Sequence, residues 1–325
     1  MCISVAPVEF GKTVTGLHQA SDGSHVVFYQ NVVGSGTRSR SRGSANRPDL
    51  LSASVSSMMP DNWSVEDEEA ALPDNWKIAE KPRGNALVIP LITSDFGSVE
   101  LLRATAETPD LLKDVRRSLM PPQRRSRGPA TLGGTRGGDV VIEQFDIYTI
   151  VRAENASAIP EAVEAVDARQ RPPLNQELFD ALERWYGCPF AVACFNNADQ
   201  GESKPIAFKY SPKYSKVFMI YTLDGHDGSV PDLNATVDLD HTVFASTHDG
   251  EKGNKVRYSD DIPEELAPYV PSHVVGRALP SGTRLVNGDI LVPVESVKAG
   301  KFEAYRVLPP SAPSRKPTTL EEALA

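Results

Sequence analysis

Residues 185–250 carry four apolar runs, which read WYGCPFAVACFNN (185–197), KPIAFKY (204–210), KVFMIYTLDGHDG (216–228) and TVDLDHTVFASTHDG (236–250). Each run is rich in β-branched and aromatic residues, and short polar connectors separate them. This pattern is typical of consecutive strands of a sheet. Aspartate and histidine residues gather at the ends of the runs, so we expect the polar groups of this block at strand ends.

Composition indicates an ordinary globular protein. The chain has 325 residues, of which 40% are hydrophobic and 24% charged, and its net charge is −9. That charge argues against nucleic-acid binding by the whole surface, although local basic patches remain compatible with it. The 26 prolines exceed the average of about 5% and favour strands, turns and ordered loops over long helices.

Cysteine usage and the N-terminal sequence predict an intracellular protein. The three cysteines are Cys2, Cys188 and Cys194. They are few and odd in number, which does not match a disulfide framework, so we expect a reducing compartment. The opening MCISVAPVEFGK has no basic leader and only an interrupted apolar run, which does not match a signal peptide. We therefore expect a cytoplasmic or otherwise intracellular protein, or a virion component if the source is a virus.

The N-terminal third predicts paired strands around a long insertion. Residues 3–10 and 25–33 are expected to be two strands, with turn chemistry in Ser-Asp-Gly-Ser at 21–24. The pattern breaks between residues 34 and 83 and resumes as a strand at 84–93. The interrupted part is Ser/Arg-rich, then acidic, and contains Pro-Asp-Asn-Trp twice, ending at Trp63 and at Trp76.

The remaining segments predict a few helices and further strands. Helices are expected at 109–120, 159–170 and 175–187, the last one ended by Gly187, and one or two strands at 139–154. Residues 273–296 predict a last strand pair with Asn287-Gly288 as its turn. We interpret the chain as an α+β fold with a mixed or antiparallel sheet. It would form one domain over residues 1–308, with the insertion at about 34–83 and a proline-rich tail at 309–325.

Several short motifs resemble those of a known group of proteins. They are Met1-Cys2-Ile3-Ser4, Tyr29-Gln30-Asn31, Asn85-Ala86 leading to Ile89-Pro90, Tyr186-Gly187, Pro205-Ile206-Ala207-Phe208 and Asp240-His241. This combination resembles an uncharacterised family of intracellular proteins from bacteria, protists and large DNA viruses. The resemblance covers most of residues 1–250 and implies a shared fold without a known activity. The 34–83 insertion departs from the family pattern and would serve a partner of its own.

Cys2 is the first candidate for chemistry. Removal of the initiator methionine would leave a thiol and an α-amine on one residue, and an α-amine with a pKa of about 7.7–8.0 can act as a general base. Class II glutamine amidotransferases, choloylglycine-type amidases and SRAP domains begin in this way, but the chain lacks the Gly-rich start of the first and a clear Arg/Asp partner pattern of the second. Asn31 and Asn85 are candidate oxyanion-hole donors. The alternative is that Cys2 is an incidental buried residue and that both asparagines are turn formers.

A cluster of aspartates and histidines is the second candidate. We single out His226, Asp238, Asp240 and His241 as ligands for a divalent metal, because imidazole and carboxylate oxygen suit several such ions. No HExxH, CxxC or EF-hand spacing accompanies them. The alternative is that the Asp-Gly pairs of this block are turns and that Asp240-His241 is a structural carboxylate–imidazole pair.

Two basic segments are the third candidate. Arginines at positions 38, 40, 42, 124 and 125 lie among Ser, Gly and Pro, and Trp63 and Trp76 follow the first group. Arginine and tryptophan are typical of binding hot spots, so Arg38, Arg40, Arg42, Trp63, Trp76, Arg124 and Arg125 are predicted partner-binding residues. Contact with RNA or phosphate is the alternative for the arginines.

The function classes can be ranked from these features. The sequence contains no Walker A, GxGxxG, GxSxG or kinase motif, and we expect no cofactor, with a divalent metal at the Asp/His cluster as the alternative. Our interpretation is a structural or interaction protein that contacts protein neighbours in a large assembly such as a virion. The alternatives are a cysteine amidohydrolase with Cys2 as an N-terminal nucleophile and a metal-dependent enzyme at the 224–249 cluster. No membrane contact is expected.

Overall fold

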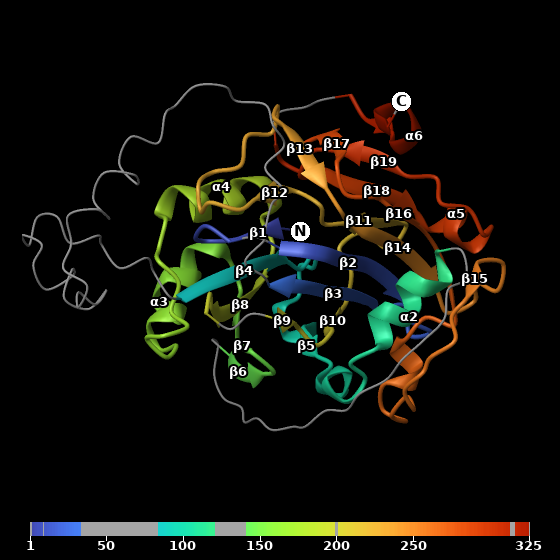
Figure 1. Cartoon of the computed structure of the whole chain (residues 1–325), viewed down its shortest axis with the longest axis horizontal. Helices are drawn as coiled ribbons and strands as arrows, with labels where there is room; N and C mark the ends of the chain where they lie inside the picture. The colour runs from blue at the N-terminus through green and yellow to red at the C-terminus, as the bar shows by residue number, and fades with distance from the viewer. Residues whose placement is uncertain are drawn as a thin grey trace, which may run out of the picture. The chain divides into compact units, whose positions relative to one another are not determined.

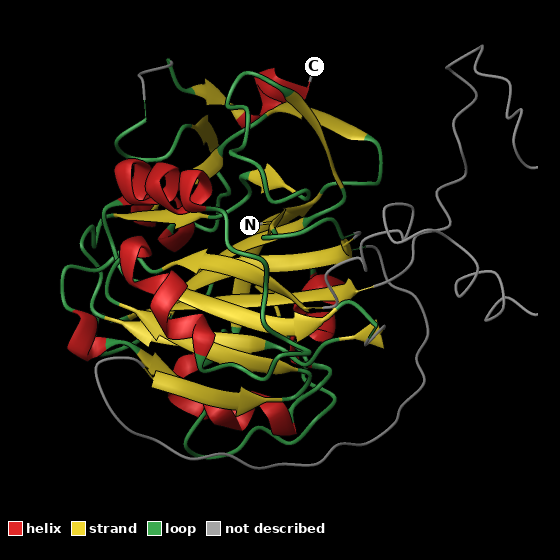
Figure 2. Cartoon of the chain, turned by 90° about the vertical axis from the view of Figure 1, so that its left-hand side faces the viewer, coloured by secondary structure: helices red, strands yellow, loops and turns green. Residues whose placement is uncertain are grey.

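The described part of the chain contains three sheets of four or more strands and two short strand pairs. The computed structural model describes residues 2–8, 10–33, 84–120, 141–198, 201–312 and 316–324. These residues fall within one compact unit that spans positions 1–35 and 82–325. Strands dominate and the helices are few and short, as Figures 1 and 2 show, so the α+β prediction is confirmed.

The largest sheet has eight strands and is mixed. Its order is β15-β16-β14-β2-β3-β10-β5, and β9 adds to the end of β3. β14 runs parallel to β2, whereas the other neighbours are antiparallel. The strands are β2 (Phe10–Gln19), β3 (His25–Val33), β5 (Glu100–Leu101), β9 (Gly201–Glu202), β10 (Ile206–Tyr210), β14 (Thr242–Thr247), β15 (Asn254–Lys255) and β16 (His273–Ala278).

The other sheets are smaller. One is an antiparallel sheet in the order β4-β8-β7-β6, built from β4 (Gly84–Pro90), β6 (Val141–Phe145), β7 (Tyr148–Ala153) and β8 (Phe190–Asn196). Another has the order β11-β18-β19-β20, built from β11 (Val217–Ile220), β18 (Asp289–Pro293), β19 (Tyr305–Val307) and β20 (Thr318–Thr319). Two pairs complete the set: β1 (Cys2–Ile3) with β12 (Asp224–Gly225), and β13 (Thr236–Leu239) with β17 (Thr283–Val286).

The helices are short and lie at the outside of the strands (Figure 2). They are α2 (Leu111–Ser118), α3 (Ile159–Glu164), α4 (Gln176–Tyr186), α5 (Val294–Lys298) and α6 (Leu320–Leu324), with 3₁₀ turns η2 (Phe96–Ser98), η3 (Arg103–Glu107), η4 (Ala156–Ala158) and η5 (Ala267–Tyr269). Asn175 caps the start of α4 by accepting from the Glu177 and Leu178 N–H groups. Gly187 ends it at a φ of 51°, the left-handed conformation that favours glycine.

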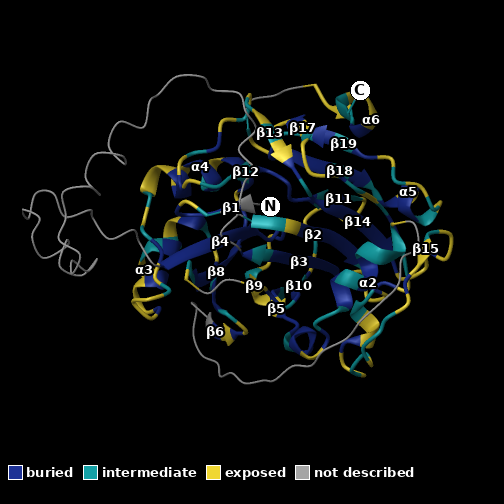
Figure 3. Ribbon diagram, viewed as in Figure 1, coloured by how far each residue is buried: buried dark blue, intermediate teal, exposed yellow. Residues whose placement is uncertain are grey.

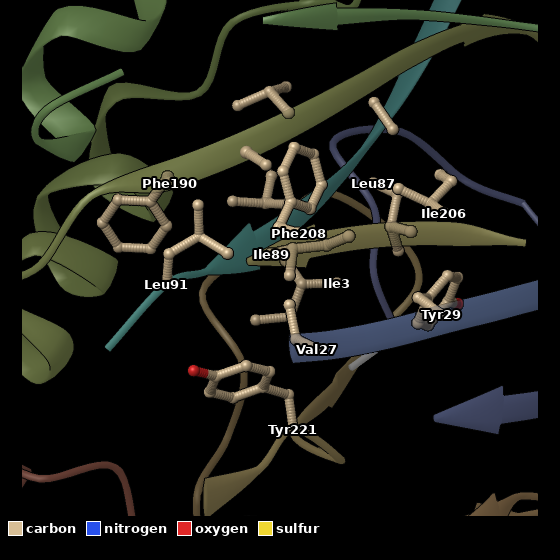
Figure 4. Packing of buried hydrophobic residues seen from close by; sticks show 14 of the residues in the cluster. Ile3, Val27, Tyr29, Leu87, Ile89, Leu91, Phe190, Ile206, Phe208 and Tyr221 are labelled. Carbon is tan, nitrogen blue, oxygen red and sulfur yellow. The ribbon is translucent and has the colours of Figure 1, made fainter. Parts of the chain in front are cut away.

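The core consists of two clusters of buried apolar side chains, a large one that includes Ile3 and a smaller one around Phe28 and Phe244. Figure 3 shows the central strands as buried, and Figure 4 shows apolar side chains of several of them packed together. Ile3 lies in this group with no exposed surface, next to residues of β3, β4 and β10. Burial of side chains of this size contributes about 1.5–3 kcal/mol each to folding, so the first residues of the chain are part of the core and not a loose end.

The β2–β3 hairpin confirms one predicted turn and corrects a predicted strand. Gly23 adopts a φ of 80°, and Ser24 donates its N–H and hydroxyl to Asp22 Oδ1 over 2.9 and 2.5 Å. The partner of β3, however, is β2 and not residues 3–10. The Thr-Val-Thr run at 13–15 supplies the β-branched residues that a strand prefers, while Pro7 lacks the N–H that a longer N-terminal strand would need.

The predicted hairpin at Asn287-Gly288 is wrong. β17 and β18 flank these residues but belong to different sheets. Asn287 is buried, and its side chain bonds to backbone groups of Asp224 and Gly288. An Asn-Gly pair marks a hairpin only when both flanking strands pair with one another, and here tertiary contacts use the asparagine amide instead. Near the C-terminus, β20 pairs with β19 and Leu320 is buried.

Two histidines are buried inside the large sheet. His18 and His25 are 2% and 3% exposed, and the ring of His25 lies 4.9 Å from that of Phe218. Burial lowers the pKa of His18 from 6.5 to about 3, with smaller contributions from His248 and His25. Burial likewise lowers the pKa of His25 to about 4. Both rings are therefore neutral in the folded protein at neutral pH.

We expect the free energy of unfolding to fall as the pH is lowered from 6.5 towards 4. In this range the unfolded chain binds protons on His18 and His25 that the folded chain does not, so each histidine lowers stability by roughly 1.4 kcal/mol per pH unit. His25→Phe keeps the aromatic packing and should remove about half of this slope in urea unfolding measured at several pH values. His273→Gln on β16 is the matched control, and an unchanged slope in His25→Phe would contradict the assignment.

Candidate functional site

The N-terminal strand forms the centre of the candidate site. β1 pairs in parallel with β12, with Cys2 aligned to Asp224 and Ile3 to Gly225 (Figure 1). The chain continues between two neighbours, since Ser4 N–H donates to the Gly225 carbonyl over 2.9 Å and Val5 N–H donates to the Ala86 carbonyl over 3.1 Å. The segment is thus hydrogen-bonded to β12 on one side and to β4 on the other. Only backbone position is described for Cys2.

A carboxylate–imidazole pair lies beside the start of this strand. His226 Nε2 is 2.9 Å from Asp224 Oδ1, with the side chains 30% and 16% exposed. The ring of Phe10 meets the His226 ring edge-on at 5.6 Å between centroids, and Val8 N–H donates to the His226 carbonyl over 3.1 Å. The histidine is therefore held at its ring and at its backbone, yet remains partly open to solvent.

The segment that carries this pair is fixed from beneath. Asn287 Oδ1 accepts from Asp224 N–H over 2.9 Å, and its Nδ2 donates to the Asp224 carbonyl over 2.8 Å. Buried Asp289 accepts from the N–H groups of Thr222 and Leu223, both at 3.0 Å, and from the Tyr186 hydroxyl at 2.7 Å. Buried polar networks of this kind rigidify the backbone that they hold. Residues 222–226 are therefore a preorganised support for Asp224 and His226.

Asn85 and Asn31 are buried in structural hydrogen bonds. Asn85 Oδ1 accepts from the N–H groups of Ala6 and Ala86 over 2.9 and 2.8 Å, and its Nδ2 donates to the Ala6 carbonyl over 3.0 Å. Asn31 Oδ1 accepts from the Tyr148 hydroxyl over 3.0 Å. Asn85 thus joins β4 to the N-terminal segment. The oxyanion role of either amide stays a prediction that these contacts do not require.

The other two cysteines are core residues. Cys188 and Cys194 are both buried and free. Burial raises the pKa of Cys194 to about 12 and that of Cys188 well above its usual range. Because the thiolate is the nucleophilic form, neither thiol is suited to nucleophilic chemistry at neutral pH.

Both ends of the insertion are anchored close to the same connection. Val33 pairs with Gly201 and Gly84 pairs with Asn196, so both strands are tied to the short link between β8 and β9. Val33 also pairs with Phe10, the residue that contacts His226. The strands that flank residues 34–83 therefore leave the body beside the N-terminal segment. The predicted partner-binding residues Arg38, Arg40, Arg42, Trp63, Trp76, Arg124 and Arg125 lie outside the described residues.

The predicted metal ligands are divided among separate ion pairs. Asp238 lies 3.6 Å from Arg284 Nε on the exposed β13–β17 pair. Asp240 Oδ2 accepts from Lys12 N–H over 2.8 Å, and its Oδ1 is 3.6 Å from His241 Nδ1. His226 contacts Asp224 instead. Within the described ranges no group of three His, Cys, Asp or Glu side chains is arranged to hold a metal.

Sequence reasoning missed the partners of His226. Asp224 was part of the cluster, but its pairing with His226 was not predicted, and neither Asn287 nor Phe10 was placed at the site. The Asp-x-His spacing is a usable signal, since residues two apart in an extended segment share one face. The contacts of Asn287 and Phe10 join distant parts of the chain and leave no local pattern.

A concave region lies beside β5 and β10 of the large sheet. A pocket of 480 Å³ is lined by polar residues that include Asp22, Ser98, Glu100 and Lys209. Lys209 Nζ is 3.0 Å from the Tyr269 hydroxyl and 3.5 Å from Glu100 Oε2, and the Tyr269 contact is the main cause that raises the pKa of Lys209. The lysine charge is thus compensated within the protein.

The comparisons with known proteins identify no family. No family model and no curated protein matches the chain. Among solved structures, the crystal structure of baculovirus P35 is similar over 91% of this chain and 92% of its own length, at 8% identity and a TM-score of 0.41. At that level of likeness we transfer neither fold family nor function. None of the helices in the described ranges has the length and hydrophobicity needed to span a membrane.

Asn85→Ala should destabilise the protein by about 2–4 kcal/mol, because it leaves buried backbone groups of Ala6 and Ala86 without partners. Urea unfolding measures the loss, and amide hydrogen exchange should show faster exchange at Ala6 in particular. The matched control is Asn234→Ala at an exposed turn position. If both variants unfold at the same urea concentration, Asn85 does not hold the N-terminal segment.

Proposed function

We propose that this chain is an interaction protein that contacts protein neighbours in a large assembly through the segment 34–83. The observation that carries the proposal is the anchoring of both flanking strands at one place. Val33 and Gly84 are buried and pair with Gly201 and Asn196, at the two ends of a single short link. Both strands that flank the segment thus meet the folded body at one place, and binding loops are commonly carried by rigid scaffolds.

The base of the segment is supported by close packing. A Cβ atom added at Gly84 would lie 2.1 Å from the Arg171 carbonyl oxygen, so only glycine fits there. Arg171 is itself fixed, because its guanidinium donates to the Val166 carbonyl over 3.1 and 3.3 Å. The position at which the chain re-enters the folded body is therefore fixed at Gly84. Binding sites depend on rigid support of this kind.

The composition of the segment supports a protein partner. Trp63 and Trp76 close two copies of Pro-Asp-Asn-Trp, and arginines precede them among serine and glycine. Tryptophan and arginine supply much of the binding energy at protein interfaces. A nucleic-acid partner would rely on the arginines alone and would show the steep salt dependence of counterion release.

Replacing residues 36–81 by a Gly-Ser linker should leave a folded body and abolish assembly. In sedimentation of native extracts, the full chain should travel in a particle much larger than its 35.3 kDa mass, whereas the deletion and the double variant Trp63→Ala/Trp76→Ala should travel as monomers. Ser52→Ala/Ser54→Ala is the control within the same segment. A full chain that sediments as a monomer in those extracts would refute the proposal.

A second candidate function is that of a cysteine amidohydrolase. The observation that favours it is the alignment of Cys2 with Asp224, whose carboxylate lies 2.9 Å from His226. A cysteine nucleophile with an imidazole base is a recurring combination in catalysis, and the backbone register places Cys2 on the strand next to this pair. Buried Cys188 and Cys194 do not compete for the role, since burial raises the pKa of both thiols.

Cys2→Ser should abolish labelling by a thiol-directed amide electrophile while leaving the unfolding transition unchanged. Intact mass spectrometry of the wild type should give a single adduct, and peptide mapping should place it on Cys2. Cys188→Ser/Cys194→Ser is the control and should retain the adduct if it folds. An unmodified wild-type protein, or an adduct elsewhere, would rule out the amidohydrolase.

A further inference from the structure

The polar pocket beside β5 and β10 has the size and composition of a ligand site. Its volume of 480 Å³ falls within the range of about 300–1,000 Å³ that is typical of small-molecule sites. Its lining is dominated by serine hydroxyls together with Asp22, Glu100 and Lys209. These residues come from the β2–β3 turn, from the start of β5, and from the end of β10 with the residues that follow it.

Hydrogen bonds within the protein hold the walls of the pocket in place. Ser98 Oγ accepts from Ser211 N–H over 3.1 Å and donates to the Asp95 carbonyl over 2.7 Å. In the segment after β10, Lys213 N–H donates to the Ile92 carbonyl over 2.9 Å. Small-molecule sites are usually largely formed before the ligand arrives, and these bonds give the pocket a fixed shape of that kind.

The charges of the pocket neutralise one another without using up their hydrogen-bonding positions. Lys209 Nζ lies 3.5 Å from Glu100 Oε2 and 3.9 Å from Asp22 Oδ2, and both distances exceed a hydrogen bond of about 2.7–3.2 Å. The ammonium donates one N–H to the Tyr269 hydroxyl. The side chains of Asp22 and Glu100 are each 50% exposed. Their carboxylates therefore retain room to accept hydrogen bonds from a ligand.

This arrangement favours a neutral ligand with several hydroxyl groups. An anion such as phosphate would meet two carboxylates, and an organic cation would meet Lys209. A zwitterion needs separated charges, whereas the ammonium here lies within 3.9 Å of both carboxylates. Sugar hydroxyls can both donate and accept, and a bond donated to a carboxylate is about twice as strong as one between neutral groups. Pro212 adds an apolar surface to the lining.

We propose that this pocket binds a neutral carbohydrate. Asp22 and Glu100 accept hydrogen bonds from hydroxyls of one sugar residue, and Lys209 donates to one of its oxygens. The serine hydroxyls of the lining supply further donors and acceptors. The inference is independent of the proposed function, because it concerns a different part of the surface and a different kind of ligand. The sugar residue can be free or can be the end of a glycan, since both present the same hydroxyls.

Saturation-transfer difference NMR on the full chain tests the proposal. The probes are glucose, galactose, mannose and N-acetylglucosamine, each as the free sugar and as its methyl glycoside. We expect transfer to at least one of these sugars. Binding of the methyl glycoside would indicate a glycan end, and binding of the free sugar alone would indicate a free sugar. Inorganic phosphate and ethylenediamine, added as competitors, should not displace the bound sugar.

Two variants assign the binding to the pocket. Ser215→Trp places a bulky side chain at an exposed lining position and should abolish the transfer. Glu100→Gln keeps the size of the side chain and should weaken binding about fivefold, because a charge-assisted hydrogen bond becomes a neutral one; it keeps the test decisive if Ser215→Trp does not fold. Glu161→Gln, exposed in the first turn of α3, is the matched control and should bind like the wild type.

Three results would overturn the proposal. The first is the absence of transfer to every sugar in the wild type. The second is transfer of equal strength in the wild type and in folded Ser215→Trp and Glu100→Gln, which would place the sugar elsewhere. The third is displacement of the sugar by phosphate or ethylenediamine, which would show that the pocket prefers a charged ligand.

Discussion

Burial of the N-terminal segment between β12 and β4 is the constraint on which the rest of the structure depends. Ile3 and Ser4 have no exposed surface, and buried backbone groups must find hydrogen-bond partners inside the protein. The partners come from Gly225, from Ala86 and from the side chain of Asn85. The segment therefore couples the β4-β8-β7-β6 sheet to residues 222–226. Neither part can move far without exposing the core.

This constraint also explains why the candidate site is rigid. Its functional groups lie on elements whose positions are fixed by buried contacts: Asp224 by Asn287, residues 222–223 by Asp289, and His226 by Phe10. The flanking strands of the 34–83 segment end beside the same contacts, because Val33 pairs with Phe10. One edge of the body thus holds both the predicted nucleophile strand and the base of the predicted interaction segment. Either proposed function would act from this edge.

Local sequence patterns predicted the elements whose signals are local. Gly187 ends α4 because a left-handed residue is needed there, and the Ser-Asp-Gly-Ser turn sets the β2–β3 hairpin. The same reasoning failed where a distant contact outweighs the local preference. Asn287 has the chemistry of a hairpin turn, but its amide is used to hold Asp224, and its neighbouring strands join different sheets.

The sequence by itself determined the α+β class, the approximate positions of most strands and helices, and the residue types able to carry chemistry. Hydrophobic periodicity and turn chemistry depend on neighbouring residues, so they are readable along the chain. Only the tertiary structure decided which polar groups meet. It separated His226 from His241, paired His226 with Asp224, and aligned Asp224 with Cys2. Those contacts depend on the order and register of strands far apart in the sequence, which are set by packing of the whole core.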